Sequence, residues 1–213
     1  MTTLRICFVG DSITNGTLDR DYLGWPGRLC MAERAAGHDV TLYNLGVRAD
    51  TSADIAGRWL GECSVRLPDH VQGALVFAFG VNDAAEEEGA GLRVPLEQSV
   101  DNAREILTGA RALHPTVWIG PAPVDESRQP IRPGPGVAYH FNNERTAALN
   151  QAYAELAETL SVPYLDVFTP LAASPDWAKA LAAGDGVHPV ASGYALIADL
   201  VRAWKPWRER LLA

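Results

Sequence analysis

Cysteine is scarce in this chain of 213 residues, which contains only Cys7, Cys30 and Cys63. The number is odd, and each cysteine falls in a segment that we predict to be a strand or a helix. Proteins that depend on disulfides, and small metal-cluster domains, carry paired cysteines at close spacing. We therefore interpret these three as small buried side chains. The sequence indicates neither a disulfide framework nor a cysteine-bound metal.

Basic residues are fewer than acidic residues, and long apolar runs are absent. The formal net charge is -8, and no basic stripe is present, which argues against a general nucleic-acid binder. No apolar run approaches the roughly 20 residues that span a bilayer, so we expect no stable membrane insertion. Residues 1–5 lead directly into an apolar segment and leave no room for a secretion signal. We expect a cytoplasmic protein, and the sequence does not determine its oligomeric state.

Short apolar runs, rich in branched and aromatic residues, recur along the chain. Because they are apolar on both faces, they are typical of parallel strands that helices cover on either side. Runs of this kind span residues 4–9, 40–45, 74–79, 117–119 and 162–167.

The segments between these runs repeat apolar residues at helical spacing. Thr51 precedes Asp54 by three residues, a variant of the capping box that begins a helix. Pro189 stands before a predicted helix over residues 191–204, as expected of a proline in a first helical turn. The two clearest apolar stripes contain Leu96, Val100, Ala103, Leu107, Ala110 and Leu113, and Leu149, Ala152, Tyr153, Leu156 and Leu160.

Strands that alternate with helices predict right-handed crossovers and a three-layer α/β/α sandwich. The length suits one domain over residues 1–213, with no internal repeat and no second domain. In such sheets, ligands bind outside the carboxyl ends of the strands. Side chains directly after the predicted strands are therefore the candidates for a functional site.

Four short strings stand at such positions or in a loop before a helix. They are residues 10–14 (GDSIT), 44–46 (NLG), 80–83 (GVND) and 185–189 (DGVHP). They contain a hydroxyl, an imidazole, a carboxylate and amide donors, which are the groups that acyl transfer by a serine hydrolase requires. Alone, Ser12 also reads as a helix N-cap, and Asn82 as a turn residue. Together, the four strings favour a shared active site.

The order and the residues of these strings resemble the motifs of the SGNH hydrolases, also called GDSL-type esterases and lipases. The resemblance extends from Gly10 to Pro189. The resemblance implies a flavodoxin-like sheet of five parallel strands. It also implies a serine ester hydrolase that cleaves carboxylic esters of small molecules through an acyl-enzyme on Ser12, without a cofactor or a metal. By the same resemblance, His188 is the base and Asp185 the acid that orients it.

The resemblance further implies an oxyanion hole made by the backbone N–H of Ser12, the backbone N–H of Gly46 and the side-chain amide of Asn82. A glycine after a strand lets the main chain approach a substrate closely, and an asparagine amide donates without adding charge. Asp11 and Asp83, which flank these positions, are expected to bond to local amides and hold the loops in shape.

Several alternatives remain. A standard α/β-hydrolase is excluded, because Gly-x-Ser-x-Gly is absent and Thr14 stands where its second glycine belongs. The sequence has no P-loop or dinucleotide-binding glycine pattern after its first strand. A metal site built from Asp11, Asp185 and His188 is conceivable, as is a non-catalytic binding module on a flavodoxin-like fold. Within the family, thioesters, lysophospholipids and acetylated carbohydrates are alternative substrates.

Residues 121–141 contain five prolines and two glycines and cannot be regular structure throughout. Long loops inside a compact domain are often functional. This one follows the predicted strand 117–119 and emerges at the carboxyl edge of the sheet, so we expect it to border the substrate pocket. Further candidates for the pocket wall are Trp25, Arg48, Tyr139, His140 and Val187.

Overall fold

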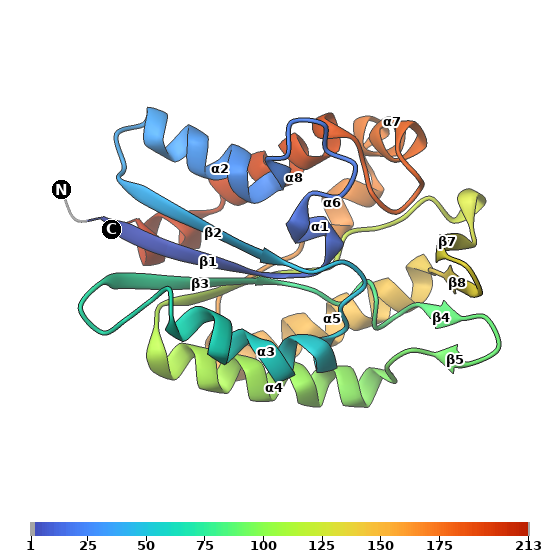
Figure 1. Ribbon diagram of the computed structural model, residues 1–213, viewed down its shortest axis with the longest axis horizontal. Coiled ribbons are helices and arrows are strands. Elements are labelled where there is room, and N and C mark those ends of the chain that lie inside the picture. The colour runs from blue at the N-terminus through green and yellow to red at the C-terminus, as the bar shows by residue number, and fades with distance from the viewer. Residues whose placement is uncertain (1–2, 213) are drawn as a thin grey trace.

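The computed structural model describes residues 3–212 and is built around a sheet of five parallel strands (Figure 1). The strands lie in the order β2-β1-β3-β6-β9, with parallel pairing at each step. This is the predicted flavodoxin-like sheet. The bounds are β1 Leu4–Gly10, β2 Val40–Gly46, β3 Gln72–Ala78, β6 Thr116–Ile119 and β9 Tyr164–Leu165.

Strand β1 lies between β2 and β3 and is buried on both faces. Alternate side chains of a strand point to opposite faces. Accordingly, Ile6 and Phe8 pack into one apolar cluster, whereas Cys7 and Val9 pack into the other. The strand therefore reads as a continuous apolar run.

The last strand is shorter than the run that predicted it. Only Tyr164 and Leu165 pair with β6, although the apolar run covers residues 162–167. Pro163, just before β9, has no backbone N–H to donate to the ladder, and β6 ends at Ile119, which pairs with Leu165.

Helices cover both faces of the sheet and complete the predicted three layers (Figure 1). Helices α2, α7 and α8 contribute to one apolar cluster, and α3, α4 and α5 contribute to the other. The bounds are α1 Ser12–Asn15, α2 Gly24–Ala35, α3 Ser52–Ser64, α4 Leu96–Leu113, α5 Asn143–Leu160, α6 Phe168–Ala172, α7 Pro175–Ala183, α8 Ala191–Ala203, and a terminal π-helical turn, η2, Trp207–Leu211.

The helices predicted from the sequence are present, with two corrections to their details. The capping box at Thr51 and Asp54 is present at the start of α3. Pro189, however, lies outside α8, because the helix begins at Ala191 and Val190 is its N-cap. The ends of the α4 stripe are also exposed, with Leu96 at 44% and Leu113 at 56%. An 18-residue helix is longer than the strands beneath it, so its first and last turns extend past the sheet.

A second, four-stranded antiparallel sheet, in the order β5-β4-β8-β7, lies near the carboxyl ends of the main strands (Figure 1). It was not predicted, because strands of two to four residues carry no readable periodicity. Strands β7 and β8 and the 3-10 turn η1 occupy much of the proline- and glycine-rich segment, which is indeed not regular throughout. The bounds are β4 Glu86–Glu87, β5 Gly91–Leu92, η1 Glu126–Arg128, β7 Ile131–Gly134 and β8 Val137–His140.

Cys7, Cys30 and Cys63 are buried and unpaired, in β1, α2 and α3 respectively. The interpretation of these residues as small buried side chains is confirmed. Within residues 3–212, no helix combines the length and the apolar character needed to cross a membrane.

Candidate active site

Ser12 lies where β1 passes directly into α1, at the carboxyl end of the main sheet. Asp11 caps this helix, since its Oδ1 accepts a hydrogen bond from the backbone N–H of Ile13 at 2.9 Å. Gly10 is required just before it, because a Cβ at this position would lie 2.1 Å from the carbonyl oxygen of Ala78 on β3. The sequence Gly-Asp-Ser thus produces a tight strand-to-helix turn that holds the Ser12 hydroxyl in place.

His188 and Asp185 lie on the loop between α7 and α8. The Asp185 carboxylate accepts hydrogen bonds from the backbone N–H groups of Val187 and His188, at 3.0 and 2.7 Å. Its other oxygen lies 2.7 Å from His188 Nδ1. The opposite ring nitrogen, Nε2, lies 2.7 Å from Ser12 Oγ. Groups 176 residues apart in the sequence therefore form one continuous hydrogen-bonded chain.

The Asp185 carboxylate is strongly stabilised in its ionised form. Burial raises its pKa, but the hydrogen bonds from the His188 ring and from two backbone N–H groups outweigh this effect and lower the pKa to about 2. Asp185 is therefore charged at any pH near neutrality. It favours the Nδ1–H tautomer of His188, which leaves Nε2 free to accept a proton from Ser12.

Asn82 and Asp83 follow β3 and face different partners. Asn82 lines the same cavity as Ser12, and its Nδ2 donates to the carbonyl oxygen of Asp50 at 2.9 Å. Asp83 accepts from the backbone N–H and the hydroxyl of Ser52, at 3.0 and 2.6 Å. Asp83 thereby ties this loop to the start of α3. Asp11 and Asp83 both bond to nearby amides, as predicted.

The structure does not bring Gly46 to the cavity. Its backbone N–H donates to the side-chain oxygen of Asn44 at 3.0 Å. A Cβ at this position would lie 2.2 Å from the backbone nitrogen of Asn15. Gly46 therefore permits α1 to pack against the end of β2, and its N–H does not face the nucleophile.

Ala49, three residues further along the chain, lies at the cavity instead of Gly46. It lines the cavity beside Ser12 and has a left-handed backbone, with φ of +67°. Within the described part of the chain, the backbone N–H groups of Ala49 and Ser12 have no hydrogen-bond acceptor. The sequence alone does not predict a left-handed turn at Ala49, because residues other than glycine and asparagine rarely adopt this conformation.

These residues open into a catalytic cavity of about 390 Å³. Its far wall comes from the proline- and glycine-rich segment, so the prediction that this segment borders the pocket is confirmed. Arg48 and Tyr139 line the cavity as predicted, whereas Trp25, His140 and Val187 do not. The lining consists of Ser12, Arg48, Ala49, Asn82, Ile131, Arg132, Pro133, Tyr139, Phe141, Asp185 and His188.

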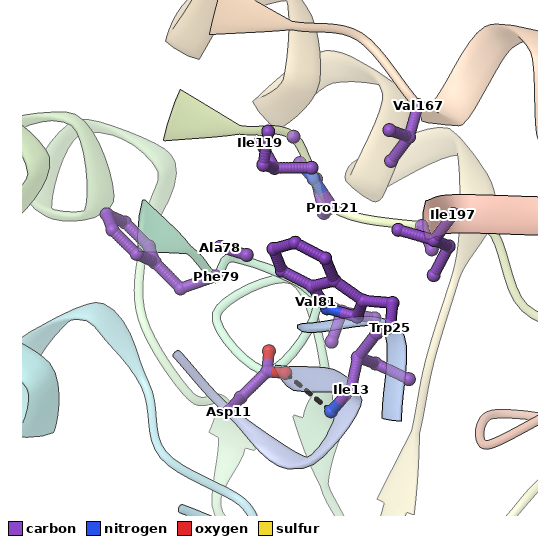
Figure 2. Close-up of a pocket in the computed structure, with 12 residues that line it drawn as sticks. Asp11, Ile13, Trp25, Ala78, Phe79, Val81, Ile119, Pro121, Val167 and Ile197 are labelled. Carbon is purple, nitrogen blue, oxygen red and sulfur yellow. Dashed lines mark hydrogen bonds between the residues drawn. The ribbon is translucent and has the colours of Figure 1, made fainter. Parts of the chain in front are cut away.

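Trp25 and Val187 are core residues. Val187 packs in a small apolar cluster with Val81 and Phe141. Trp25 lines a second, inner cavity of about 20 Å³, roughly the space of one water molecule. Asp11 lines this inner cavity among apolar side chains and is bonded to Ile13 (Figure 2). Asp11 therefore faces a different cavity from Asp185 and His188, and no metal-binding group of three His, Cys, Asp or Glu residues occurs within residues 3–212.

The sequence model of the GDSL-like lipase/acylhydrolase family matches residues 8–196. A comparison with curated proteins gives no match.

Solved structures share the fold. A lipase/acylhydrolase from Enterococcus faecalis superposes with a TM-score of 0.75 at 24% identity, covering 95% of this chain and 94% of the other. The acetylxylan esterase Axe2 from Geobacillus stearothermophilus gives 0.69 at 17% identity, covering 95% of each chain. The esterase EstA from a Pseudoalteromonas species gives 0.66 at 17% identity, covering 92% and 93%. The α/β/α architecture is therefore that of this class of hydrolases.

Proposed function

This chain belongs to the GDSL-like lipase/acylhydrolase family and is an ester hydrolase, and from that premise we propose that Ser12, His188 and Asp185 form its catalytic triad. The observation that carries the proposal is the hydrogen-bonded chain from Ser12 Oγ through the His188 ring to the Asp185 carboxylate, with both ring contacts at 2.7 Å. This is the relay that activates a hydroxyl as a nucleophile at neutral pH.

In this mechanism, Ser12 Oγ attacks the carbonyl carbon of the ester while its proton passes to His188 Nε2. The tetrahedral intermediate then collapses, and His188 returns the proton to the departing alcohol oxygen. The acyl group remains on Ser12. A water molecule next attacks the acyl carbon, giving its proton to His188, and the second collapse releases the carboxylic acid and restores the hydroxyl. Asp185 stays ionised throughout and stabilises the transient imidazolium.

We assign the oxyanion hole to the backbone N–H groups of Ser12 and Ala49 and to the side-chain amide of Asn82. The two backbone groups line the catalytic cavity without an acceptor in the described structure. Asn82 Nδ2 uses one hydrogen on the carbonyl of Asp50, so its orientation is held and its second hydrogen is free to donate. Donors held in advance of the reaction are the main source of transition-state stabilisation in acyl transfer. Gly46 has no such role in this assignment.

We propose that the substrate is a small carboxylic ester. We further propose that residues 1–213 act as a single catalytic domain. The apolar wall made by Ile131, Pro133, Tyr139 and Phe141 suits a short acyl group. Thioesters and acetylated sugars present the same carbonyl to the same groups, and assays with both separate them from simple esters. The sugar alternative has the support that one structural relative is described as an acetylxylan esterase.

The substitution Ser12→Ala tests the proposal directly. It removes the nucleophile and leaves the fold intact, so we expect hydrolysis of 4-nitrophenyl acetate to fall by roughly 10³-fold or more. A fluorophosphonate probe should label the wild-type protein at Ser12 and leave the variant unlabelled. Ser64→Ala, which removes a hydroxyl bonded only to a nearby helix carbonyl, is the matched control and should keep full activity. Equal activity of Ser12→Ala and the control would refute the triad.

A further inference from the structure

Two arginines without a carboxylate partner among residues 3–212 line the catalytic cavity or the cavity beside it, in a protein whose net charge is -8. Arg48 lines this cavity and also lines a neighbouring outer cavity of about 650 Å³. Arg20 contributes a second guanidinium to the outer cavity. Neither Arg20 nor Arg48 has a carboxylate within 4.0 Å among the described residues.

The carboxylates that line the two cavities are already engaged. Asp185 is bonded to His188, and Asp19, whose side chain is fully buried, is paired with Arg28. Arg132, in the wall of the catalytic cavity, lies 3.6 Å from Glu88, but both side chains are about 60% exposed. An exposed pair of this kind is weak. The positive charge around the two cavities therefore exceeds the negative charge available to neutralise it.

Polar and apolar residues line both cavities, and the apolar residues of the catalytic cavity come mainly from one wall. The second sheet contributes this wall, in which Ile131, Pro133, Tyr139 and Phe141 lie beside the exposed Arg132, and its apolar part suits the acyl group, which stays on Ser12 after the first step. The outer cavity is lined mainly by polar residues, among them Asn15, Thr17 and Asn44. It suits the alcohol part, which has to leave toward solvent. Arg48 lies at the junction of the two cavities.

From this arrangement we propose that the outer cavity is an alcohol-side subsite selective for an anionic group, and that Arg48 is its specificity-determining residue. The substrate class is an ester whose alcohol carries a carboxylate or a phosphate a few atoms from the scissile bond. A guanidinium binds either group through charge-assisted, bidentate hydrogen bonds. This inference rests on the proposed ester hydrolysis and refines its substrate.

The test compares 4-acetoxybenzoate with its neutral analogue 4-acetoxybenzamide, for wild-type protein and for Arg48→Ala. We expect the kcat/KM for the anionic ester to fall about fivefold, because a solvent-exposed charge-assisted hydrogen bond is lost. The kcat/KM for the neutral ester should change less than twofold. Arg48→Glu should widen the difference, and higher ionic strength should narrow it.

Arg104→Ala is the matched control, since it removes the same charge from an exposed position on α4, away from the cavities. It should leave the ratio of the two kcat/KM values unchanged. Equal losses for both esters in Arg48→Ala, or an anion-selective loss in Arg104→Ala, would overturn the subsite while leaving the ester hydrolysis standing. If the wild-type protein hydrolysed neither ester and Ser12 resisted the fluorophosphonate, the proposed function itself would fall.

Discussion

Ala49 holds a left-handed backbone conformation, with φ of +67°, beside the nucleophile. For a residue with a Cβ this conformation costs roughly 1–2 kcal/mol. The turn persists because its surroundings hold it, including a hydrogen bond from Arg93 Nη2 to the Ala49 carbonyl at 2.7 Å. The conformation directs the Ala49 N–H toward the catalytic cavity in the proposed mechanism, so the strain is stored where it serves the reaction.

Replacing Ala49 with glycine should therefore stabilise the protein, by about 0.5–1 kcal/mol, because the relief of strain exceeds the added chain entropy of glycine. The backbone N–H is retained, so kcat should stay within about twofold of wild type. Urea unfolding and initial rates with 4-nitrophenyl acetate measure the two effects. Ala148→Gly, in the middle of α5, is the contrasting control and should cost about 1 kcal/mol. A loss of stability in Ala49→Gly would contradict the prediction.

At the scale of elements, the small antiparallel sheet completes the cavity that the main sheet begins. The hairpin of β7 and β8 supplies the apolar wall, and Arg93, which directly follows β5, joins that wall to the Ala49 turn. The Arg93 guanidinium lies 4.6 Å from the centre of the Tyr139 ring and also donates to the Ala49 carbonyl. The Arg93 side chain thus connects Tyr139, in the apolar wall of the cavity, to the turn that carries Ala49, one of the proposed oxyanion donors.

We predict that Arg93→Ala lowers kcat about tenfold with little change in KM for a small acetate ester, because the oxyanion donors lose their positioning. Stability should fall by about 1–3 kcal/mol, since a charge-assisted hydrogen bond and a cation–π contact are both lost. Arg93→Lys keeps one donor and should recover part of kcat.

Arg34→Ala, at an exposed site on α2, is the control and should change neither quantity. Steady-state kinetics combined with thermal unfolding distinguish the roles. A variant that lost stability but kept kcat would show that Arg93 supports the fold and does not position the donors.

At the scale of the whole molecule, two buried carboxylates couple stability to pH. Burial among apolar side chains raises the pKa of Asp11 to about 7, although the Ile13 N–H partly opposes it and the Asp83 charge adds to it. Burial likewise raises the pKa of Asp83 to about 6, against the hydrogen bonds from Ser52. The folded state therefore holds protons that the unfolded chain has released, and stability decreases as pH rises from about 4 to about 7.

The substitution Asp11→Asn should remove the larger part of this dependence, because an amide keeps the cap on Ile13 and cannot ionise. At about pH 4 the carboxyl group is protonated in the folded protein, and the variant and the wild type should be similar in stability. At about pH 8 the variant should be more stable by roughly 3 kcal/mol. Free energies of unfolding in urea across this range provide the measurement, with the exposed Asp101→Asn as control. A difference between Asp11→Asn and wild type that did not vary with pH would rule out this coupling.

Local sequence pattern was enough to predict the three layers and a site shared by the four strings, whereas the family resemblance implied the five-stranded parallel sheet and the roles of Ser12, His188 and Asp185. Strands buried on both faces read as continuous apolar runs, and parallel strands bring their carboxyl ends to one edge. The strings GDS, NLG and GVND therefore lie at that edge, whereas DGVH lies on the loop between α7 and α8, and only its resemblance to the family implied that it meets Ser12. The pairing of Asp185 with His188 could be predicted for a further reason, because a carboxylate three residues before an imidazole is a local arrangement.

Tertiary structure alone decided which backbone segment lines the cavity beside Ser12 and what forms the rest of that cavity. Gly46 and Ala49 stand three residues apart, and the direction of an N–H depends on a turn that alanine rarely adopts. The strands of the second sheet are too short for a period, and the contacts of Arg93 with Ala49 and Tyr139 join segments 44 and 46 residues away. Such contacts arise from packing between distant segments of the chain, and no local sequence pattern predicts which distant segments pack together.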